Sequence, residues 1–420
     1  MEQSPHTRAL PQSPPFRARC ALSTIFFING VVLASWVPHI PAVKARQAIG
    51  DGQLGLMLLS MAVGSVFALP LAGRLIGRFG SRRMTAMAAL GFCLALPLPI
   101  LSPTIGLLTL ALALLGACNG LLDVSMNAQA VEVERGYQRA IMSSFHGLFS
   151  LGGLVGAGLA GLVMSCGVGD VQHVTTITLL SILVVVSVLR WLTPSPPQQK
   201  GRSPTFVKPT GVLLGLGVLA FFGLLTEGAM ADWSAVYLHD VLGADSATAA
   251  AGFAACSLMM AAGRFGGDHL ANHFGPQKLL RASGTLAAVG LGSGLLIGEP
   301  ITGILGFGLV GLGIANIIPL LFSAAGRLRG VQAGTALAAV AMTGYCGFLA
   351  GPPLIGLTAE LTSLPIALGI VSACCALIAV SAGVVLRPPR VQSDMERTPG
   401  QRGAIEHRGV VEGSGEEALS

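Results

Sequence analysis

Charged residues are scarce in this sequence: Asp, Glu, Lys and Arg make up only 10% of its 420 residues, against about 25% in a typical soluble domain. A soluble chain of this length would form about two or three domains, each of which needs a charged exterior. Hydrophobic residues account for 52% of the chain, and the mean hydropathy is +0.73. These values argue against a soluble enzyme, a disordered chain or a nucleic-acid-binding protein, and they indicate a polytopic membrane protein.

Signals of cofactor and metal chemistry are also missing. No CxxC spacing occurs, and the 8 cysteines lie in apolar runs or, for Cys20, at the edge of one, which is typical of small buried side chains. The G-x-G-x-x-G strings at 156–161 and 306–311 lie inside apolar runs, so they indicate close helix packing rather than a dinucleotide site. His269 and His273 have metal-pair spacing but lack the glutamate of zinc proteases. The sequence contains no P-loop, which argues against an ATP-driven pump. We therefore expect neither a cofactor nor a metal.

Twelve apolar runs are long enough to cross a bilayer, which takes about 20 mostly apolar residues. They lie at 21–42, 53–73, 84–102, 104–130, 140–166, 174–192, 212–239, 247–266, 279–298, 301–325, 333–359 and 364–386. The sequence therefore predicts an all-α membrane protein with twelve transmembrane helices.

A polar, proline-rich stretch at 193–210 separates the sixth run from the seventh. Such a composition is typical of a linker, so we expect two six-helix bundles at 21–192 and 211–387. Residues 1–20 and 388–420 are predicted to be tails, and the polar second tail is expected to be disordered.

The basic residues predict the orientation of the chain. If both termini lie on one side, all 25 Lys and Arg residues fall on that side except Lys44 and Arg46. Because basic residues accumulate in cytoplasmic loops, we expect both termini in the cytoplasm. We also expect the chain to lie in a bacterial inner membrane. The same rule explains the net charge of +6 without a nucleic-acid partner. The outer loops carry acids instead, namely Asp51, Asp170, Asp240, Asp245 and Glu299.

The two halves repeat short strings in the same order. Ala-Ser-Trp at 34–36 matches Ala-Asp-Trp at 231–233, and Gly-Ala-Cys-Asn at 116–119 matches Gly-Ile-Ala-Asn at 313–316. Duplicated six-helix halves are the architecture of secondary transporters, whose substrate site lies near the midplane between the halves.

The loop between the second and third runs carries a family motif. It resembles the G-x-x-x-D-R-x-G-R-R signature of the major facilitator superfamily, and the resemblance covers residues 20–387. Gly77 stands at the position of the motif acid, and Ser81 is an extra residue. The resemblance implies a gating loop, although the arginines also have a purely topological interpretation. Its residues are Gly73, Arg74, Gly80, Arg82 and Arg83, with Asp268 in the second-half copy.

Two further strings narrow the resemblance. Residues 120–129 are similar to the fucose-permease-like branch, which has an acid followed by an Asn four residues later. Residues 142–146 resemble a bacterial group near it that includes a membrane protein of rhizopine gene clusters. The resemblance implies a small polyhydroxylated or amino-sugar-like solute.

Asp123 is the strongest candidate for a functional residue. It lies twelve residues before Arg135, or about 18 Å along a helix, and a carboxylate in the bilayer costs at least about 2.5–3.5 kcal/mol. Asn119, Asp123 and Asn127 are spaced four residues apart and therefore share one helical face. The amides of Asn119 and Asn127 are candidates for substrate binding. We expect Asp123 to carry a coupled proton; the alternative is a structural carboxylate bonded to neighbouring helices.

Glu227 is the second candidate for proton or substrate binding. The repeat aligns it with Gly30, near mid-depth, whereas Asp232 is expected to be solvated at the outer mouth. Other candidates for substrate contact are Asn29, Asn316, His146, Tyr345, Trp36 and Trp233. Each also has a structural interpretation: the amides, the histidine and the tyrosine as packing or bridging groups, and the tryptophans as an interfacial belt.

We expect a secondary transporter of a small polar solute, similar to a sugar, polyol or amino sugar, coupled to protons and working by alternating access. Its partners are the solute, protons and the lipid bilayer, and we expect a monomer that is not an enzyme. The alternatives are a proton-antiport exporter of drugs or metabolites and, from another class, a membrane solute sensor. An intramembrane enzyme is disfavoured because no span holds an acid pair or a nucleophile with its base.

Overall fold

The computed structural model describes residues 16–137, 141–194, 211–326, 328 and 333–386. Within these residues the regular secondary structure is helical. The described residues up to Val385 belong to one compact unit. The predicted second tail lies outside the described residues, as does the predicted linker beyond residue 194.

Twelve helical segments of the described chain are long and apolar enough to cross a membrane, which confirms the prediction. In lipid a helix is favoured because it satisfies its backbone hydrogen bonds internally. The first half contains α1 (Phe16–Trp36), η1 (Val37–His39), α2 (Ile40–Gln47), α3 (Asp51–Phe79), α4 (Ser81–Ala95), α5 (Pro97–Leu101), α6 (Ile105–Tyr137), α7 (Met142–Ser165), α8 (Asp170–Val188) and η2 (Leu189–Trp191). The second half contains α9 (Val212–Val236), η3 (Tyr237–Val241), α10 (Ser246–Phe274), α11 (Pro276–Ile297), α12 (Pro300–Ile314), α13 (Ile317–Gly326), α14 (Ala333–Leu361) and α15 (Leu364–Val385).

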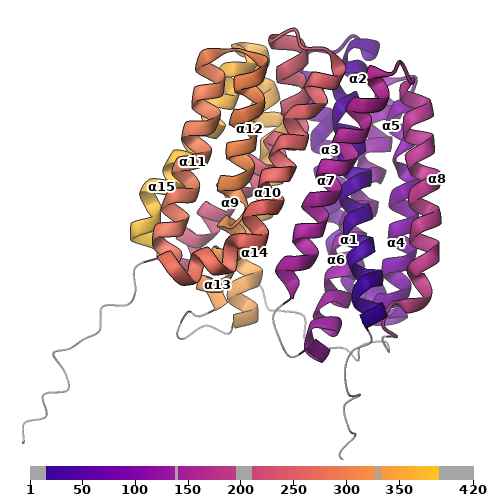
Figure 1. Ribbon diagram of the computed structural model, residues 1–420, viewed down its shortest axis with the longest axis vertical. Helices are drawn as coiled ribbons and strands as arrows, with labels where there is room; N and C mark the ends of the chain where they lie inside the picture. The colour runs from indigo at the N-terminus through magenta and orange to yellow at the C-terminus, as the bar shows by residue number, and fades with distance from the viewer. Residues whose placement is uncertain (1–15, 138–140, 195–210, 327, 329–332, 387–420) are drawn as a thin grey trace, which may run out of the picture. The chain divides into compact units, whose positions relative to one another are not determined.

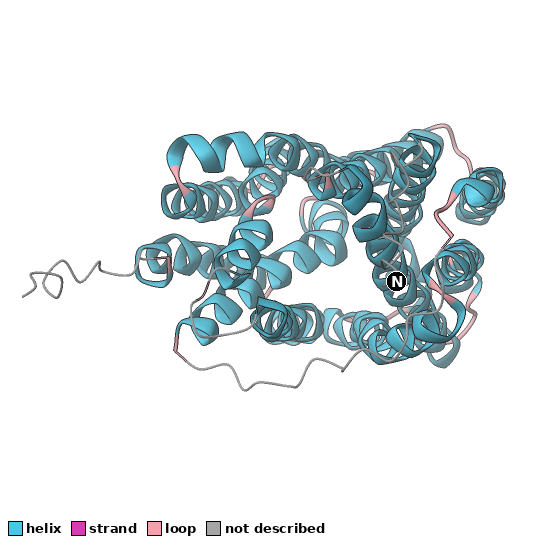
Figure 2. Cartoon of the chain, turned by 90° about the horizontal axis from the view of Figure 1, so that it is seen from below, coloured by secondary structure: helices cyan, strands magenta, loops and turns pink. Residues whose placement is uncertain are grey.

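The two halves lie side by side, with the helices seen nearly end-on in Figure 2. We call the face where α1 begins the N-terminal face, at the bottom of Figure 1, and the other the opposite face. Packing within the halves repeats, because α1 packs on α7 as α9 packs on α14, and α3 packs on α6 as α10 packs on α12. Between the halves, α7 packs on α10 and α3 on α14. The repeated strings in the sequence therefore correspond to repeated packing.

The loop motif and its second-half copy are mostly helix. Residues 73–79 are the last turns of α3, and α10 continues to Phe274. The chain breaks at Gly80 (φ 82°, ψ 154°) and at Gly275 (φ 81°, ψ 153°). These left-handed φ values favour glycine, and their near identity in the two halves shows that the repeat extends to the backbone of this turn.

The first G-x-G-x-x-G string lies inside α7, where close helix packing was predicted. A Cβ atom on Gly156 would lie 2.4 Å from the carbonyl oxygen of Val31 in α1, and one on Gly161 would lie 3.0 Å from Ala250 in α10. A Cβ on Gly158 would meet nothing within 4 Å. Two of the three glycines therefore allow helices to approach closely.

Candidate functional site

A cavity of about 830 Å³ lies between the two halves, within the range of small-molecule sites. Its walls come from α1, α3, α6 and α7 of the first half and from α9, α10, α13 and α14 of the second. It extends from Trp36 and Val37, at the end of α1, to Met142, the first residue of α7. The cavity therefore runs from the region of the opposite face to that of the N-terminal face.

Polar contacts hold the halves together at the opposite face. Lys44 in α2 lies 2.6 Å from Asp51 of its own half and 2.6 Å from Asp240 of the other half. Glu360, near the end of α14, accepts a hydrogen bond from the backbone N–H of Gly52 (3.1 Å). An acid at a helix N-terminus satisfies free N–H groups and complements the helix dipole. The second half thus caps a helix of the first.

A buried histidine pair braces the break between α1 and α2. In η1, Nδ1 of His39 lies 3.1 Å from Oδ1 of Asp170, and Nε2 of His39 lies 2.8 Å from Nδ1 of His173. Both histidine side chains are buried, and both partners belong to α8. The pair therefore fixes the start of α2, the helix that carries Lys44.

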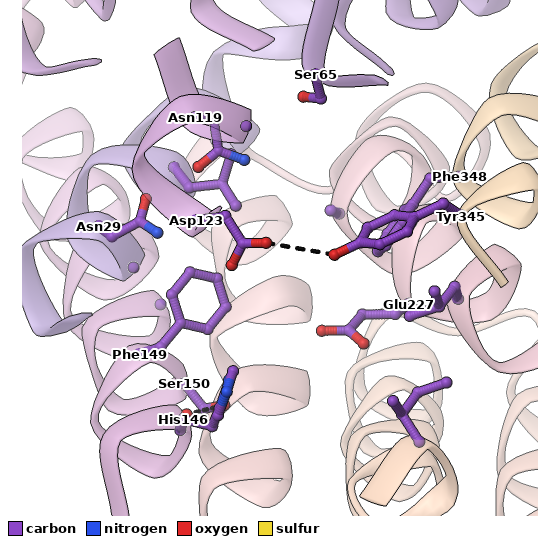
Figure 3. A pocket seen from close by; sticks show the side chains of 18 of the residues that line it. Asn29, Ser65, Asn119, Asp123, His146, Phe149, Ser150, Glu227, Tyr345 and Phe348 are labelled. Carbon is purple, nitrogen blue, oxygen red and sulfur yellow. Dashed lines mark hydrogen bonds between the residues drawn. The ribbon is translucent and has the colours of Figure 1, made fainter. Parts of the chain in front are cut away.

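Asp123 faces the cavity from α6, as Figure 3 shows. Tyr345 Oη of α14 donates a hydrogen bond to Asp123 Oδ2 (3.3 Å), across the two halves. Asn127 Nδ2 donates to Asp123 Oδ1 (3.0 Å), and Asn119 lines the same wall. The predicted polar stripe thus reaches the cavity, and the groups bonded to its carboxylate are neutral.

Glu227 lies on the cavity wall formed by α9 and pairs with Arg264 of α10, Oε1 to Nη2 3.2 Å. Arg264 Nη1 also donates to Ser150 Oγ (2.7 Å) and approaches the backbone oxygen of His146 (3.5 Å). Ser150 and His146 belong to α7, so this guanidinium links the halves. The His146 ring packs edge-on against Phe26 (5.4 Å between centroids) and also lines the cavity.

The remaining predicted contact residues divide into two groups. Asn29, Trp36 and Asn316 line the cavity, and Asn316 Nδ2 donates to the backbone oxygen of Gly263 (3.0 Å). Trp233, which the repeat aligns with Trp36, is instead fully buried away from the lining. The repeat relates the backbones of the two segments but not the surroundings of these side chains.

Asp232 differs from its expected position. It was expected to be solvated at the outer mouth, but it is half-buried and lines the cavity. The reason is the length of the cavity, which continues past Glu227 along α9 to the level of Asp232.

The predicted gating-loop residues lie around the break at Gly80. Gly73 and Arg74 belong to α3, and Arg82 and Arg83 to the first turn of α4. Arg82 Nη2 donates to the backbone oxygens of Leu189 (3.5 Å) and Arg190 (3.3 Å) of its own half, where a cation complements free carbonyl groups. Asp268 belongs to α10, but its side chain lies outside the described residues.

Sequence reasoning missed two residues that join the halves, Arg264 and Glu360. Arg264 precedes Asp268 in the second-half copy of the motif, which the resemblance placed in a gating loop. Its position in an apolar stretch of α10 was nevertheless a usable signal, since an intramembrane charge is rarely without a partner. Glu360 gave no such signal, because it lies near a helix end where an acid is common.

The sequence matches the profile of the Major Facilitator Superfamily over residues 22–331. An uncharacterized MFS-type transporter of Yersinia pestis is 40% identical over 363 residues, which are 86% of this chain and 94% of that protein. The membrane protein MosC of Rhizobium meliloti is 38% identical over 367 residues, which are 84% of this chain and 88% of that protein.

Solved structures of transporters share the fold. The nucleoside transporter NupG has a TM-score of 0.68 at 13% identity, covering 88% of this chain and 99% of that one. The E. coli fucose:proton symporter FucP has a TM-score of 0.60 at 17% identity, covering 88% and 98%. The family resemblance predicted from the motifs is confirmed. The chain belongs to the Major Facilitator Superfamily and is a multi-pass membrane transporter, not an enzyme.

Proposed function

We propose that this transporter moves a small polar solute together with protons, by alternating access of the central cavity. The observation that carries the proposal is Asp123, a carboxylate on the cavity wall whose hydrogen-bond partners Tyr345 and Asn127 are neutral. A carboxylate without a basic partner in a largely apolar surrounding binds a proton readily. Glu227, held by Arg264, is the second group proposed to take part in proton binding.

The cross-half contacts support alternating access. Lys44–Asp240 and Glu360–Gly52 join the halves at the opposite face, while the cavity extends to Met142 at the start of α7. With the N-terminal face in the cytoplasm, as the basic residues predict, this arrangement corresponds to an inward-facing state. Rocking of the halves would break these contacts and expose the cavity to the other side.

The proposed solute is similar to a sugar, a polyol or an amino sugar. Amides and hydroxyls suited to binding hydroxyl groups line the cavity, among them Asn29, Asn119, Asn316 and Tyr345. NupG is a nucleoside transporter and FucP a fucose:proton symporter, so both act on hydroxylated solutes. Gating by the Gly73–Arg83 segment through Arg82 and Arg83 is part of the same proposal.

Export is the second candidate. Four phenylalanines line the cavity, Phe149, Phe253, Phe322 and Phe348, and such walls suit an apolar drug or metabolite exchanged for protons. The same carboxylates would serve, so the direction of proton movement separates the two functions.

The test is solute flux in proteoliposomes with an internal pH dye. Candidate solutes come from a thermal-shift screen of the purified full chain against polyols, sugars, amino sugars and nucleosides. We expect Asp123→Asn to abolish solute accumulation driven by a pH gradient, and Asp245→Asn, outside the cavity, to retain it. Accumulation by Asp123→Asn equal to that of the wild type would refute the proton role, and proton movement opposite to the solute would establish export.

A further inference from the structure

A chain of three hydrogen-bonded side chains lies in the first half near the opposite face. His39 is its middle member, with Nδ1 3.1 Å from Asp170 Oδ1 and Nε2 2.8 Å from Nδ1 of His173. The two histidines are 0% and 3% exposed. Nε2 of His173 is buried and has no hydrogen-bond partner among the described residues. The chain is therefore a buried titratable group that the proposed binding of solute and protons does not use.

The number of protons that this chain can hold is limited. A hydrogen bond between two imidazole nitrogens needs an N–H on one of them and a free acceptor on the other. One added proton preserves this match, because either ring can carry it and the carboxylate of Asp170 compensates the charge. A second added proton places N–H groups on both facing nitrogens and two positive charges on rings whose centroids are 5.1 Å apart. The bond between His39 and His173 then breaks.

This bond supports a segment that touches the second half. His39 lies in η1, which packs on α9 and α10, and α2, which follows directly, packs on α9. Lys44 of α2, at the top of Figure 1, makes the 2.6 Å contact with Asp240 across the halves. His173 belongs to α8, so its bond with His39 ties η1 to the body of the first half. Separation of the two rings therefore loosens the cross-half packing of η1 and the support of Lys44.

We propose that the pair of His39 and His173 is an acid-sensitive switch that controls opening of the opposite face. The face stays closed while the pair holds at most one added proton, and it opens when both rings are charged and move apart. Because the separated rings take up more protons than the closed pair, acid favours the open state. The inference rests on the proposed function only for alternating access. With this face outside the cell, as the basic residues predict, external acid opens the cavity toward external protons and solute.

Few charged groups act on the pair. Asp170 acts on both rings, and Arg46 of α2 acts on Asp170. The elements packed against η1 and α8 are α1, α2, α4, α5, α7, α9, α10 and η2. Their other described acids, bases and histidines lie elsewhere: Arg17, Arg19, Arg82, Arg83, Arg190, His269 and His273 toward the N-terminal face, His146, Glu227, Asp232 and Arg264 on the cavity wall, and Lys44 between Asp51 and Asp240.

The experiment is a pH titration of the distance between spin labels on Ile105 and Glu299, one exposed position of this face in each half. The full chain without native cysteines is placed in lipid nanodiscs and measured from pH 7.5 to 5.5. Uptake of one proton on opening changes the equilibrium constant by at most about tenfold per pH unit. Because the second proton binds over only part of this interval, we expect the ratio of open to closed molecules to rise about tenfold.

Two variants test the location of the switch. In His173→Asn the amide can still hydrogen-bond to His39 but cannot take up a positive charge, so this ratio should change less than about threefold. His39→Gln removes the other titrating ring and should lose the response as well. The matched control is His239→Asn, because His239 lies 2.7 Å from Asp240 but within the second half, and it should retain the response. The cavity carboxylates are unchanged in all these proteins, so differences between the curves belong to the histidines.

Each outcome supports or overturns one part of the proposal. A ratio that does not rise in acid in the wild type would overturn the switch. A full response that persists in both His173→Asn and His39→Gln would overturn its location, and a response lost only in His239→Asn would assign it to that histidine instead. Accumulation of solute by Asp123→Asn would refute the proposed proton role and leave this inference intact. Proton-coupled flux with an opposite face that ignores pH would refute this inference alone.

Discussion

Replacing Lys44 with glutamine is expected to favour opening of the opposite face. Lys44 Nζ lies 2.6 Å from a carboxylate oxygen of Asp51 and 2.6 Å from one of Asp240. Only the contact with Asp240 joins the two halves, so only that contact is broken when the halves separate there. Asp51 would stay beside Lys44 in either state.

The magnitude follows from the exposure of the three side chains, 16% for Lys44, 22% for Asp51 and 25% for Asp240. Fully exposed ion pairs contribute about 0.2–1 kcal/mol, and buried pairs cost more to break. We expect the partly buried contact between Lys44 and Asp240 to stabilise closure of the opposite face by about 1–1.5 kcal/mol. Because 1.4 kcal/mol is a factor of ten in an equilibrium constant, the equilibrium constant for opening at the opposite face should rise about five- to twelvefold.

The assay is a distance distribution between spin labels on two exposed positions at this face, Ile105 and Glu299, in a background without native cysteines. Lys44→Gln should increase the long-distance population. Asp51→Asn is the matched control, because it removes a contact within one half and should have a smaller effect. In a double-mutant cycle, Lys44→Gln with Asp240→Asn should shift the population no more than either change alone. Additive shifts, or no shift for Lys44→Gln, would refute the cross-half contact as a determinant of closure.

Three further predictions concern stability. Gly156→Ala should lower the melting temperature, because its Cβ would lie 2.4 Å from the Val31 oxygen and such overpacking costs about 1–3 kcal/mol. Gly158→Ala in the same helix is the control and should be tolerated. Equal melting temperatures of the two variants would contradict the packing argument. Arg264→Gln should destabilise the chain by leaving Glu227 without its partner, and adding Glu227→Gln should restore part of the loss, which differential scanning fluorimetry would detect. Asp245, beside the start of α10, accepts a hydrogen bond from the backbone N–H of Thr248 (2.7 Å), which holds the pKa of that carboxyl below its usual range. The stabilising effect of this hydrogen bond is therefore present at neutral pH and lost as the pH falls below about 4. The difference in melting temperature between wild type and Asp245→Ala should shrink over that interval. A difference that stays constant would argue against the cap.

The positions of the spanning helices could be predicted because the bilayer sets one dominant rule. A segment in lipid has to be long, apolar and internally hydrogen-bonded, and these properties are local to the sequence. Asp123 could be found for the same reason, as an acid in an apolar run. The break at Gly80 was also visible in the motif, although the helix before it, α3, extends through Gly73 and Arg74.

The contacts between distant segments could not be predicted in this way. Tyr345 and Asp123 are 222 residues apart, and their contact depends on the relative tilt of two bundles, which helical periodicity does not define. Trp36 and Trp233 show the limit of the repeat, since equivalent positions face different surroundings. Arg264 stands in the second-half copy of the motif, which suggested a loop, whereas α10 continues beyond it to Phe274.

The same sparse charges that predict the orientation also close one face of the molecule. The positive-inside rule leaves acids in excess on the opposite face, where they would repel one another across the halves. Lys44, one of the two exceptions to that rule, lies between Asp51 and Asp240, and Glu360 caps the start of α3 through Gly52. Each acid in these contacts therefore meets a positive charge or a helix N-terminus. Because such contacts are partly exposed and individually weak, they hold one conformation without making it permanent, which is the property that the proposed alternating access requires.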